Sequence, residues 1–324
     1  MTLLSIRDLC VDYLAQDRTV RAVDRFSLDI PKGESFGIVG ESGSGKSTLI
    51  LALMGLLSKR KALVTGSALL DGADLIAMSE DERRAVRWKK MSIVFQNAMN
   101  SFSPVHRIGK MMQDIYFAHC PDSAKAERRT RMEELLGLVG LPPRVCDLYP
   151  HELSGGMMQR VNIALSLMFN PELLIMDEAT TALDVVTQTQ ILKEIAQLEE
   201  KLDITRVMVT HDISVVASSC ENVVVMYAGR CLEVGSVKTV LTKPAHPYTK
   251  GLIGGFPAED EEGSDEEKRP LTSIPGTLPD LGAVPAGCIF EPRCDQSADA
   301  CKSASVNLAS LDDGRKVRCR RYGG

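Results

Sequence analysis

Short apolar runs alternate with helical patterns along most of the chain, and this alternation predicts an α/β fold. Buried strands of a parallel sheet are indicated by short, mostly apolar runs, which occur at residues 36–39, 91–95, 173–177 and 206–210. Residues 3–9 and 22–30 instead alternate apolar with polar side chains. That period of two predicts the strands of an antiparallel flank.

Helical patterns fill the space between these strands. A helix is predicted to begin at residue 48, and residues 125–138 have helical spacing that Pro142 and Pro143 interrupt. Residues from about 97 to 168 are helix-rich, which predicts a helical subdomain. Strands and helices then alternate again from residue 173 to about 241, so that a parallel sheet covered on both faces is completed.

The composition changes sharply after the last of these elements. Residues 259–267 are an acidic run without an apolar side chain, which predicts a solvated linker. We therefore expect a core domain at residues 1–254, a linker at 255–270 and a small cysteine-rich C-terminal extension at 271–324.

A glycine-rich loop lies between the first buried strand and the helix that follows it. The pattern Gly-x-x-x-x-Gly-Lys-Ser predicts a phosphate-binding loop, because its glycines let backbone N–H groups turn inward around an anion. Lys46 is expected to reach the β- and γ-phosphates of a nucleotide, and the Ser47 hydroxyl to bind Mg²⁺. The predicted phosphate-binding residues are Gly40, Glu41, Ser42, Gly43, Ser44, Gly45, Lys46, Ser47 and Thr48.

Two carboxylates follow the buried strand at residues 173–177. Asp177 ends that strand, where phosphate-loop NTPases hold Mg²⁺ with an aspartate. Glu178 comes next and is expected to orient or deprotonate the attacking water. A solvated loop carboxylate is the alternative for a lone glutamate.

The chain also contains the sequence Leu-Ser-Gly-Gly-Met-Met-Gln-Arg at residues 153–160. From residue 3 to about 250 it resembles the ATP-binding subunit of an ABC transporter, which implies an ABC-type phosphate-loop ATPase core. The resemblance implies that Tyr13 stacks on adenine, that Gln96 contacts Mg²⁺ and the attacking water, and that His211 touches the γ-phosphate. It also implies that the loop Ala182-Leu183-Asp184 crosses to the opposite subunit.

A further implication of the resemblance concerns Ser154, Gly155 and Gly156. The resemblance implies that they bind the γ-phosphate of the ATP held by the opposite subunit, so that two ATPase chains sandwich two nucleotides. A two-fold arrangement makes the two interfaces equivalent. The sequence leaves open whether the opposite subunit is a second copy or a related ATPase.

The C-terminal region narrows the resemblance further. The motifs His-Pro-Tyr-Thr at residues 246–249 and Gly-Cys-x-Phe-x-x-Arg-Cys at 287–294 are similar to those of ATPase subunits from dipeptide and oligopeptide importers. This implies that ATP hydrolysis energises peptide uptake through two permease subunits, with an extracytoplasmic binding protein supplying the peptide. Nickel, glutathione or oligosaccharide uptake is the alternative within transport. A DNA-repair or translation protein is disfavoured, because a long coiled-coil insertion and a second cassette are missing.

Four of the nine cysteines lie in this region, namely Cys288, Cys294, Cys301 and Cys319. The segment has few large apolar side chains, which favours a cross-link in place of a core. A 4Fe-4S cluster is the preferred interpretation, because some relatives carry one at matching cysteines and thiolates suit it. Zinc, and free or partly oxidised thiols, are the alternatives.

Composition sets outer limits on these interpretations. No run approaches the roughly 20 apolar residues of a membrane span, and charged residues come too early for a secretory signal. We expect a peripheral protein at the cytoplasmic face of the inner membrane, attached through a partner. The net charge of −5 gives no electrostatic support for nucleic-acid binding.

Overall fold

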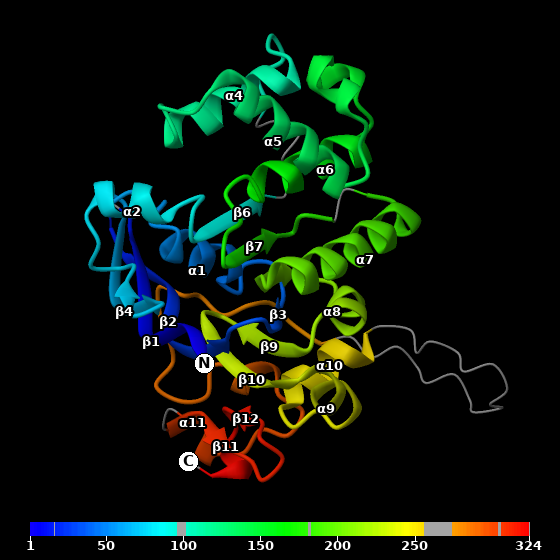
Figure 1. Ribbon diagram of the computed structural model, residues 1–324. Coiled ribbons are helices and arrows are strands. Elements are labelled where there is room, and N and C mark those ends of the chain that lie inside the picture. Colours follow the sequence, from blue (N-terminus) through cyan, green and yellow to red (C-terminus); the bar gives the residue numbers. More distant parts are fainter. Residues whose placement is uncertain (16, 96–101, 181–182, 256–273, 304–305, 324) are drawn as a thin grey trace, which may run out of the picture. The chain divides into compact units, whose positions relative to one another are not determined.

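The computed structural model describes residues 1–15, 17–95, 102–180, 183–255, 274–303 and 306–323 (Figure 1). The chain forms two compact units. Unit 1 comprises Met1, Pro31–Glu34 and Met78–Val209, and unit 2 comprises Thr2–Ile30, Ser35–Ala77 and Thr210–Gly324. The predicted boundaries at residues 254 and 271 stay predictions.

Unit 2 holds most of the strands. Its elements are β1 (Thr2–Leu14), β2 (Thr19–Pro31), β3 (Ser35–Val39), α1 (Lys46–Leu53), β4 (Ala62–Leu70), β5 (Ala73–Asp74), α8 (Ile213–Ser219), β9 (Asn222–Tyr227), β10 (Arg230–Ser236), α9 (Val237–Thr242), α10 (Pro247–Gly254), η3 (Glu291–Arg293), α11 (Ala300–Ser303), β11 (Ala309–Ser310), β12 (Lys316–Val317) and η4 (Arg320–Tyr322).

Two groups of strands form the framework of unit 2. The first is a four-stranded sheet in the order β2-β1-β4-β5, in which β4 is antiparallel to both β1 and β5. The antiparallel flank is therefore where the alternating pattern predicted it. The second group runs β3-β9-β10-β12-β11, and only the β3–β9 pair is parallel.

The antiparallel β9–β10 pair corrects the expectation of a parallel sheet extending to about residue 241. A two-residue turn, Ala228 and Gly229, joins the strands with φ values of 47° and 81°. Two successive positive φ values give the tight turn whose twist matches paired antiparallel strands. The short spacing between the two apolar runs was the signal for a hairpin.

Unit 1 combines parallel strands with helices. Its elements are α2 (Glu80–Val86), β6 (Met91–Phe95), α4 (Ile108–His119), α5 (Lys125–Leu138), η1 (Pro143–Asp147), η2 (Pro150–Glu152), α6 (Gly155–Ser166), β7 (Leu173–Asp177), α7 (Val185–Leu202) and β8 (Thr205–Thr210). The strands β6, β7 and β8 pair in parallel, with β7 in the middle. They lie where the apolar runs predicted strands, and β7 is buried throughout.

The helices of unit 1 follow from their own periodicity. Helix α5 has the bounds that its spacing predicts, and it buries Met132, Leu135 and Leu136 on one side. Its exposed side carries the ion pair Arg129–Glu133 with a nitrogen–oxygen distance of 2.5 Å, four residues apart, which adds local helix stability.

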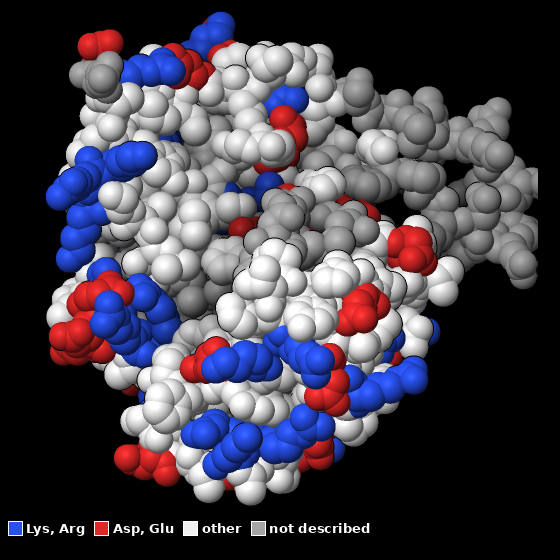
Figure 2. Space-filling model, turned by 90° about the horizontal axis from the view of Figure 1, so that it is seen from above, with Lys and Arg blue, Asp and Glu red and all other residues white. Residues whose placement is uncertain are grey.

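On the face seen in Figure 2, basic and acidic side chains are interspersed, and neither charge covers the face continuously.

No helix in the described part of the chain is both long and apolar enough to cross a membrane.

A core cluster in unit 2 fixes the C-terminal segment, which we define as residues 274–303 and 306–323. Ile289 and Phe290 are each 2% exposed and pack with Tyr227 and Tyr248. The ring of Phe290 lies 5.2 Å from that of Tyr227 and 5.4 Å from that of Tyr248. Aromatic burial of this size is a large contribution to stability, so the segment shares the core of unit 2.

His246 is the N-cap of α10 and is only 1% exposed. Its Nδ1 accepts a hydrogen bond from the Tyr248 N–H at 3.0 Å, so the ring must be neutral at that nitrogen. Burial lowers the pKa of His246 to about 3. The helix cap and the packing of α10 therefore both require the uncharged imidazole.

Acidification should destabilise the protein through His246. An unfolded histidine has a pKa of about 6.5, so below that value the unfolded chain takes up a proton that the folded chain refuses until about pH 3. Stability therefore falls as the pH decreases, with His246 contributing about 2 kcal/mol of loss near pH 5. Thermal unfolding followed by circular dichroism from pH 7.5 to 5 measures this. His246→Asn keeps a capping acceptor and should flatten the pH dependence, whereas an unchanged slope would contradict the assignment.

Candidate functional site

The loop between β3 and α1, residues 40–45, lies unusually close to neighbouring backbone. A Cβ atom at Gly40 would lie 2.1 Å from the Met226 carbonyl oxygen, and one at Gly45 would lie 2.3 Å from that of Ala22. Gly45 also has a φ of 97° and is the N-cap of α1. The glycines are required here because any side chain would collide with β9 or β2.

Lys46 places its charge inside this loop. It is 5% exposed, and its Nζ donates to the carbonyl oxygens of Gly40 at 2.7 Å and Glu41 at 2.9 Å, and to Ser44 Oγ at 3.3 Å. Buried ammonium groups need such acceptors to offset lost hydration. The loop thus presents a fixed positive charge beside the N-terminus of α1, which is an arrangement suited to anions.

Tyr13 lies near Thr48, which is in the first turn of α1. It is the penultimate residue of β1, and its hydroxyl is 3.4 Å from Thr48 Oγ1. The structure therefore brings the predicted aromatic side chain together with the predicted phosphate-binding residues, all within unit 2.

Glu41 has two partners that the sequence reasoning missed. Its N–H donates to the Tyr248 hydroxyl at 3.0 Å, and its Oε2 accepts from Arg293 at 2.9 Å. Both partners belong to the motifs that carry the resemblance to peptide importers, His-Pro-Tyr-Thr and Gly-Cys-x-Phe-x-x-Arg-Cys. The sequence carries no signal for their contact with Glu41, since Arg293 lies 252 residues from it.

The predicted acidic residues lie in unit 1 at the end of β7. Asp177 is 9% exposed and is the last residue of the strand. Glu178 has a φ of 47°, and its N–H donates to the Val209 carbonyl oxygen at 2.8 Å. A left-handed conformation is uncommon for glutamate and costs roughly 1 kcal/mol or more. The backbone bends at Glu178, directly after the strand ends at Asp177.

Ser154, Gly155 and Gly156 form the exposed start of α6, also in unit 1. Ser154 is the N-cap, and its Oγ accepts from the Met157 N–H at 3.3 Å. A Cβ atom on Gly155 would meet nothing within 4 Å, so this glycine leaves open space at the helix N-terminus.

The remaining predicted residues are placed only in part. His211 follows β8 directly and is exposed. Asp184 caps α7, where hydrogen bonds from Thr187 lower its pKa. Gln96 and Ala182 lie outside the described residues.

The predicted metal site at the C-terminal cysteines is wrong. Among the described residues, which include all nine cysteines, no group of three or more His, Cys, Asp or Glu side chains is arranged to hold a metal ion, and no disulfide joins any of these cysteines. Neither a 4Fe-4S cluster nor zinc is supported. The segment is held by the buried side chains of Ile289 and Phe290, so it needs no cross-link in place of a core. Burial also raises the pKa of Cys288 and Cys294, which favours the neutral thiol over the ligating thiolate.

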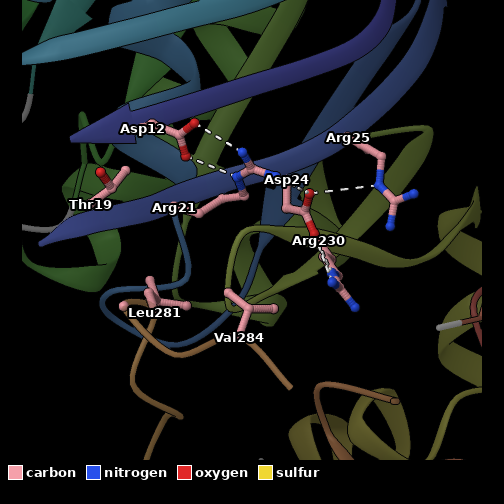
Figure 3. Close-up of a pocket in the computed structure, with 9 residues that line it drawn as sticks. Asp12, Thr19, Arg21, Asp24, Arg25, Arg230, Leu281 and Val284 are labelled. Atoms are coloured by element: carbon pink, nitrogen blue, oxygen red, sulfur yellow. Dashed lines mark hydrogen bonds and ion pairs between the residues drawn. The ribbon is translucent and has the colours of Figure 1, made fainter. Parts of the chain in front are cut away.

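A separate pocket of about 520 Å³ opens in unit 2 and contains none of the predicted site residues (Figure 3). Its guanidinium groups face carboxylates: Arg21 Nε donates to Asp12 at 2.9 Å, and Arg25 lies 3.7 Å from Asp24. These pairs neutralise much of the local charge. The pocket is lined by Asp12, Thr19, Arg21, Asp24, Arg25, Arg230, Leu281, Gly282 and Val284.

Comparison with known proteins gives two family matches. Residues 23–181 match the ABC transporter family model, and residues 232–301 match the model for the oligopeptide/dipeptide transporter C-terminal region. The dipeptide transport ATP-binding protein DppD of Escherichia coli is 39% identical over 321 residues, covering 98% of this chain and 96% of that protein. The chain belongs to the ABC transporter family.

Two further relatives agree with this membership. The oligopeptide transport ATP-binding protein OppD of Salmonella typhimurium is 40% identical over 319 residues, covering 98% of this chain and 93% of that protein. The dimeric post-hydrolysis structure of the ATP-binding cassette MJ0796, bound to ADP and phosphate, is 29% identical with a TM-score of 0.64, covering 72% of this chain and 98% of that one. The predicted ABC-type ATPase with mixed sheets and helices is confirmed.

Two glycines with similar backbone conformations allow the loop geometry to be tested. Gly45 and Gly72 have φ values of 97° and 82°, but a Cβ atom on Gly72 would meet nothing within 4 Å. Gly72→Ala should therefore cost only about 1 to 2 kcal/mol, from its conformation alone. Gly45→Ala should cost more and abolish nucleotide binding, because its methyl group collides with the Ala22 carbonyl.

Thermal unfolding and nucleotide titration of both variants measure the difference. Equal behaviour of the two alanine variants would show that close approach to β2 does not shape the loop.

Proposed function

We propose that this chain is the ATP-hydrolysing subunit of an importer that takes up dipeptides or oligopeptides through membrane permease subunits. The observation that carries this proposal is full-length identity of about 40% to ATP-binding subunits named for dipeptide and oligopeptide transport, combined with the matching C-terminal family region. A catalytic core alone would support only an ATPase. The C-terminal match favours peptides over other solutes.

The residues of the phosphate loop fit a nucleotide. Backbone positions that only glycine can occupy let N–H groups turn inward, and the Lys46 ammonium, bonded to the Gly40 carbonyl, adds positive charge. In our proposal Gly40–Thr48 bind the phosphates and Tyr13 stacks on the adenine. Ser47, Asp177 and Gln96 would hold Mg²⁺, which neutralises phosphate charge when bound.

Catalytic roles would belong to Lys46 and to two further side chains, Glu178 and His211. Glu178 would accept a proton from, or orient, the attacking water. His211 and Lys46 would place positive charge or a hydrogen-bond donor at the γ-phosphate, where negative charge shifts during transfer. Phosphoryl transfer needs mainly positioning and charge neutralisation, so no covalent role is assigned to any residue.

The exposed start of α6 supports a composite site. A Cβ atom on Gly156 would lie 3.0 Å from Thr187 Cγ2, but Ser154 and Gly155 are exposed and leave the helix N-terminus open, which favours anions. We propose that it binds the γ-phosphate of ATP on a second ATPase subunit, so that ATP joins the pair and hydrolysis releases it. The solved relative described as dimeric is consistent with this arrangement.

The partners follow from the same proposal. Two permease subunits would contact the ATPase pair, and an extracytoplasmic binding protein would deliver the peptide. The chain would then work as a peripheral protein at the cytoplasmic face of the membrane.

Glu178→Gln tests the proposed base. The amide keeps the shape of the side chain but cannot take a proton, so ATP binding should persist while turnover falls by about 10² or more. ATP-driven peptide uptake in proteoliposomes containing the permease should stop as well. Glu172→Gln is a matched control, because Glu172 directly precedes the same strand. Normal hydrolysis in Glu178→Gln would place the base elsewhere, and normal hydrolysis without peptide uptake by the unaltered complex would contradict the importer assignment.

Ser154→Arg tests the composite site. A bulky cation at the start of α6 should abolish turnover but leave ATP affinity of the single subunit nearly unchanged, because it acts across the dimer interface. Lys46→Ala should also be inactive alone. Mixing the two variants rebuilds one intact site if the chain pairs with itself, so ATPase activity should return. No recovery, together with activity on adding a different ATPase subunit, would establish an obligate pair of unlike subunits.

A further inference from the structure

The C-terminal segment is coloured orange to red in Figure 1. It contacts the phosphate loop through Arg293. The Arg293 NH1 group donates to Glu41 Oε2 at 2.9 Å, although 252 residues separate the two in sequence. The Arg293 side chain is 7% exposed and that of Glu41 is 29% exposed. A largely buried guanidinium thus faces a half-buried carboxylate of the loop.

The Arg293 guanidinium is held in one orientation. Its Nε donates to the Pro275 carbonyl at 2.7 Å and its NH2 to the Ile274 carbonyl at 3.3 Å. NH1 also lies 3.3 Å from the Tyr227 hydroxyl, and the guanidinium carbon lies 5.6 Å from the centre of that ring. A planar group with these fixed partners delivers its charge at a defined place, which a lysine would not do.

A second contact joins the segment to the same loop. A Cβ atom on Gly43 would lie 3.2 Å from Leu278 Cδ1. The ring of Tyr248 packs against Phe290 of the segment, and its hydroxyl accepts a hydrogen bond from the Glu41 N–H. Both the backbone and the side chain of Glu41 are therefore fixed from outside the loop.

Glu41 is the only acidic residue among residues 40–48, and a free carboxylate there would repel phosphate groups. Its carbonyl oxygen is also an acceptor for Lys46 Nζ. An ion pair on Glu41 can thus lower the negative potential at the loop and fix an acceptor that holds the phosphate-binding lysine.

We propose that Arg293 is a positioning residue for nucleotide binding, which neutralises and fixes Glu41 so that the loop accepts phosphates. This inference rests on the proposed binding of ATP at residues 40–48. It gives the C-terminal segment a part in the ATPase site, in addition to its packing on unit 2. A purely structural contact is the competing explanation.

Arg293→Met in the intact chain tests the proposal, because methionine keeps the apolar stem but removes the charge and the hydrogen bonds. The dissociation constant for ATP, measured by calorimetric titration, should rise about tenfold, as expected for losing a charge-assisted contact. Adenosine binding should not change, because it lacks phosphates. The decisive variant is Arg293→Met combined with Glu41→Gln, which removes the unpaired carboxylate and should return ATP affinity to within about threefold of the unaltered protein.

Arg18→Met is the matched control. Arg18 pairs with Asp280 at 2.9 Å, so it also joins the C-terminal segment to the rest of unit 2, but at an exposed site. Its loss should leave ATP affinity unchanged. An equal loss in this control, or a failure of Glu41→Gln to restore binding, would reduce Arg293 to a structural contact.

Arg293→Lys keeps the test decisive if Arg293→Met does not fold. Lysine retains the positive charge but not the fixed hydrogen bonds of the guanidinium, so ATP binding should weaken while adenosine binding stays unchanged, and unaltered ATP affinity would overturn the proposal. If the unaltered protein bound no ATP, the proposed function would fail before the role of Arg293 was tested.

Discussion

The close approach of the phosphate loop to its neighbours is the constraint on which unit 2 depends. Gly45 touches β2, and the Ser44 carbonyl accepts from the Gly229 N–H of the β9–β10 turn at 2.8 Å. That turn is itself tied to β2, because Arg230 pairs with Asp24 at 2.7 Å with both side chains 6% exposed. The loop therefore cannot shift without disturbing a buried ion pair, whose rupture is costly.

The cysteine-rich segment shows how a compositional argument can mislead. Few large apolar residues and four cysteines suggested a metal, yet two buried side chains of the segment pack against two tyrosines of the main body. A sequence shows how many apolar residues a segment contains. It does not show that Tyr227 and Tyr248, from other elements, complete the core around Phe290.

Local signals were sufficient for most elements. The apolar run at residues 173–177 and the helical spacing at 125–138 correspond to β7 and α5 residue for residue, because period and burial decide those elements. The direction of β10 depended on the two-residue turn Ala228-Gly229, and the only signal for it was the short spacing between the two apolar runs, since the runs themselves do not show the direction of a strand. Within the site, the loop glycines and Lys46 could be predicted from their spacing. The partners of Glu41 could not, since the contact between Glu41 and Arg293 spans most of the chain.

The C-terminal segment is attached to the rest of unit 2 at more than one place, again through residues far apart in the sequence. Glu233 of β10 is fully buried and accepts from the N–H groups of Ala245 and His246, each at 2.9 Å, and from Arg315 at 3.2 Å. A buried carboxylate is tolerated only with such partners. Arg315 thus anchors the end of the segment to β10, while Arg293 anchors its start to the phosphate loop. Because the β9–β10 turn also supports that loop through Gly229, the two anchors tie the segment to adjoining parts of unit 2.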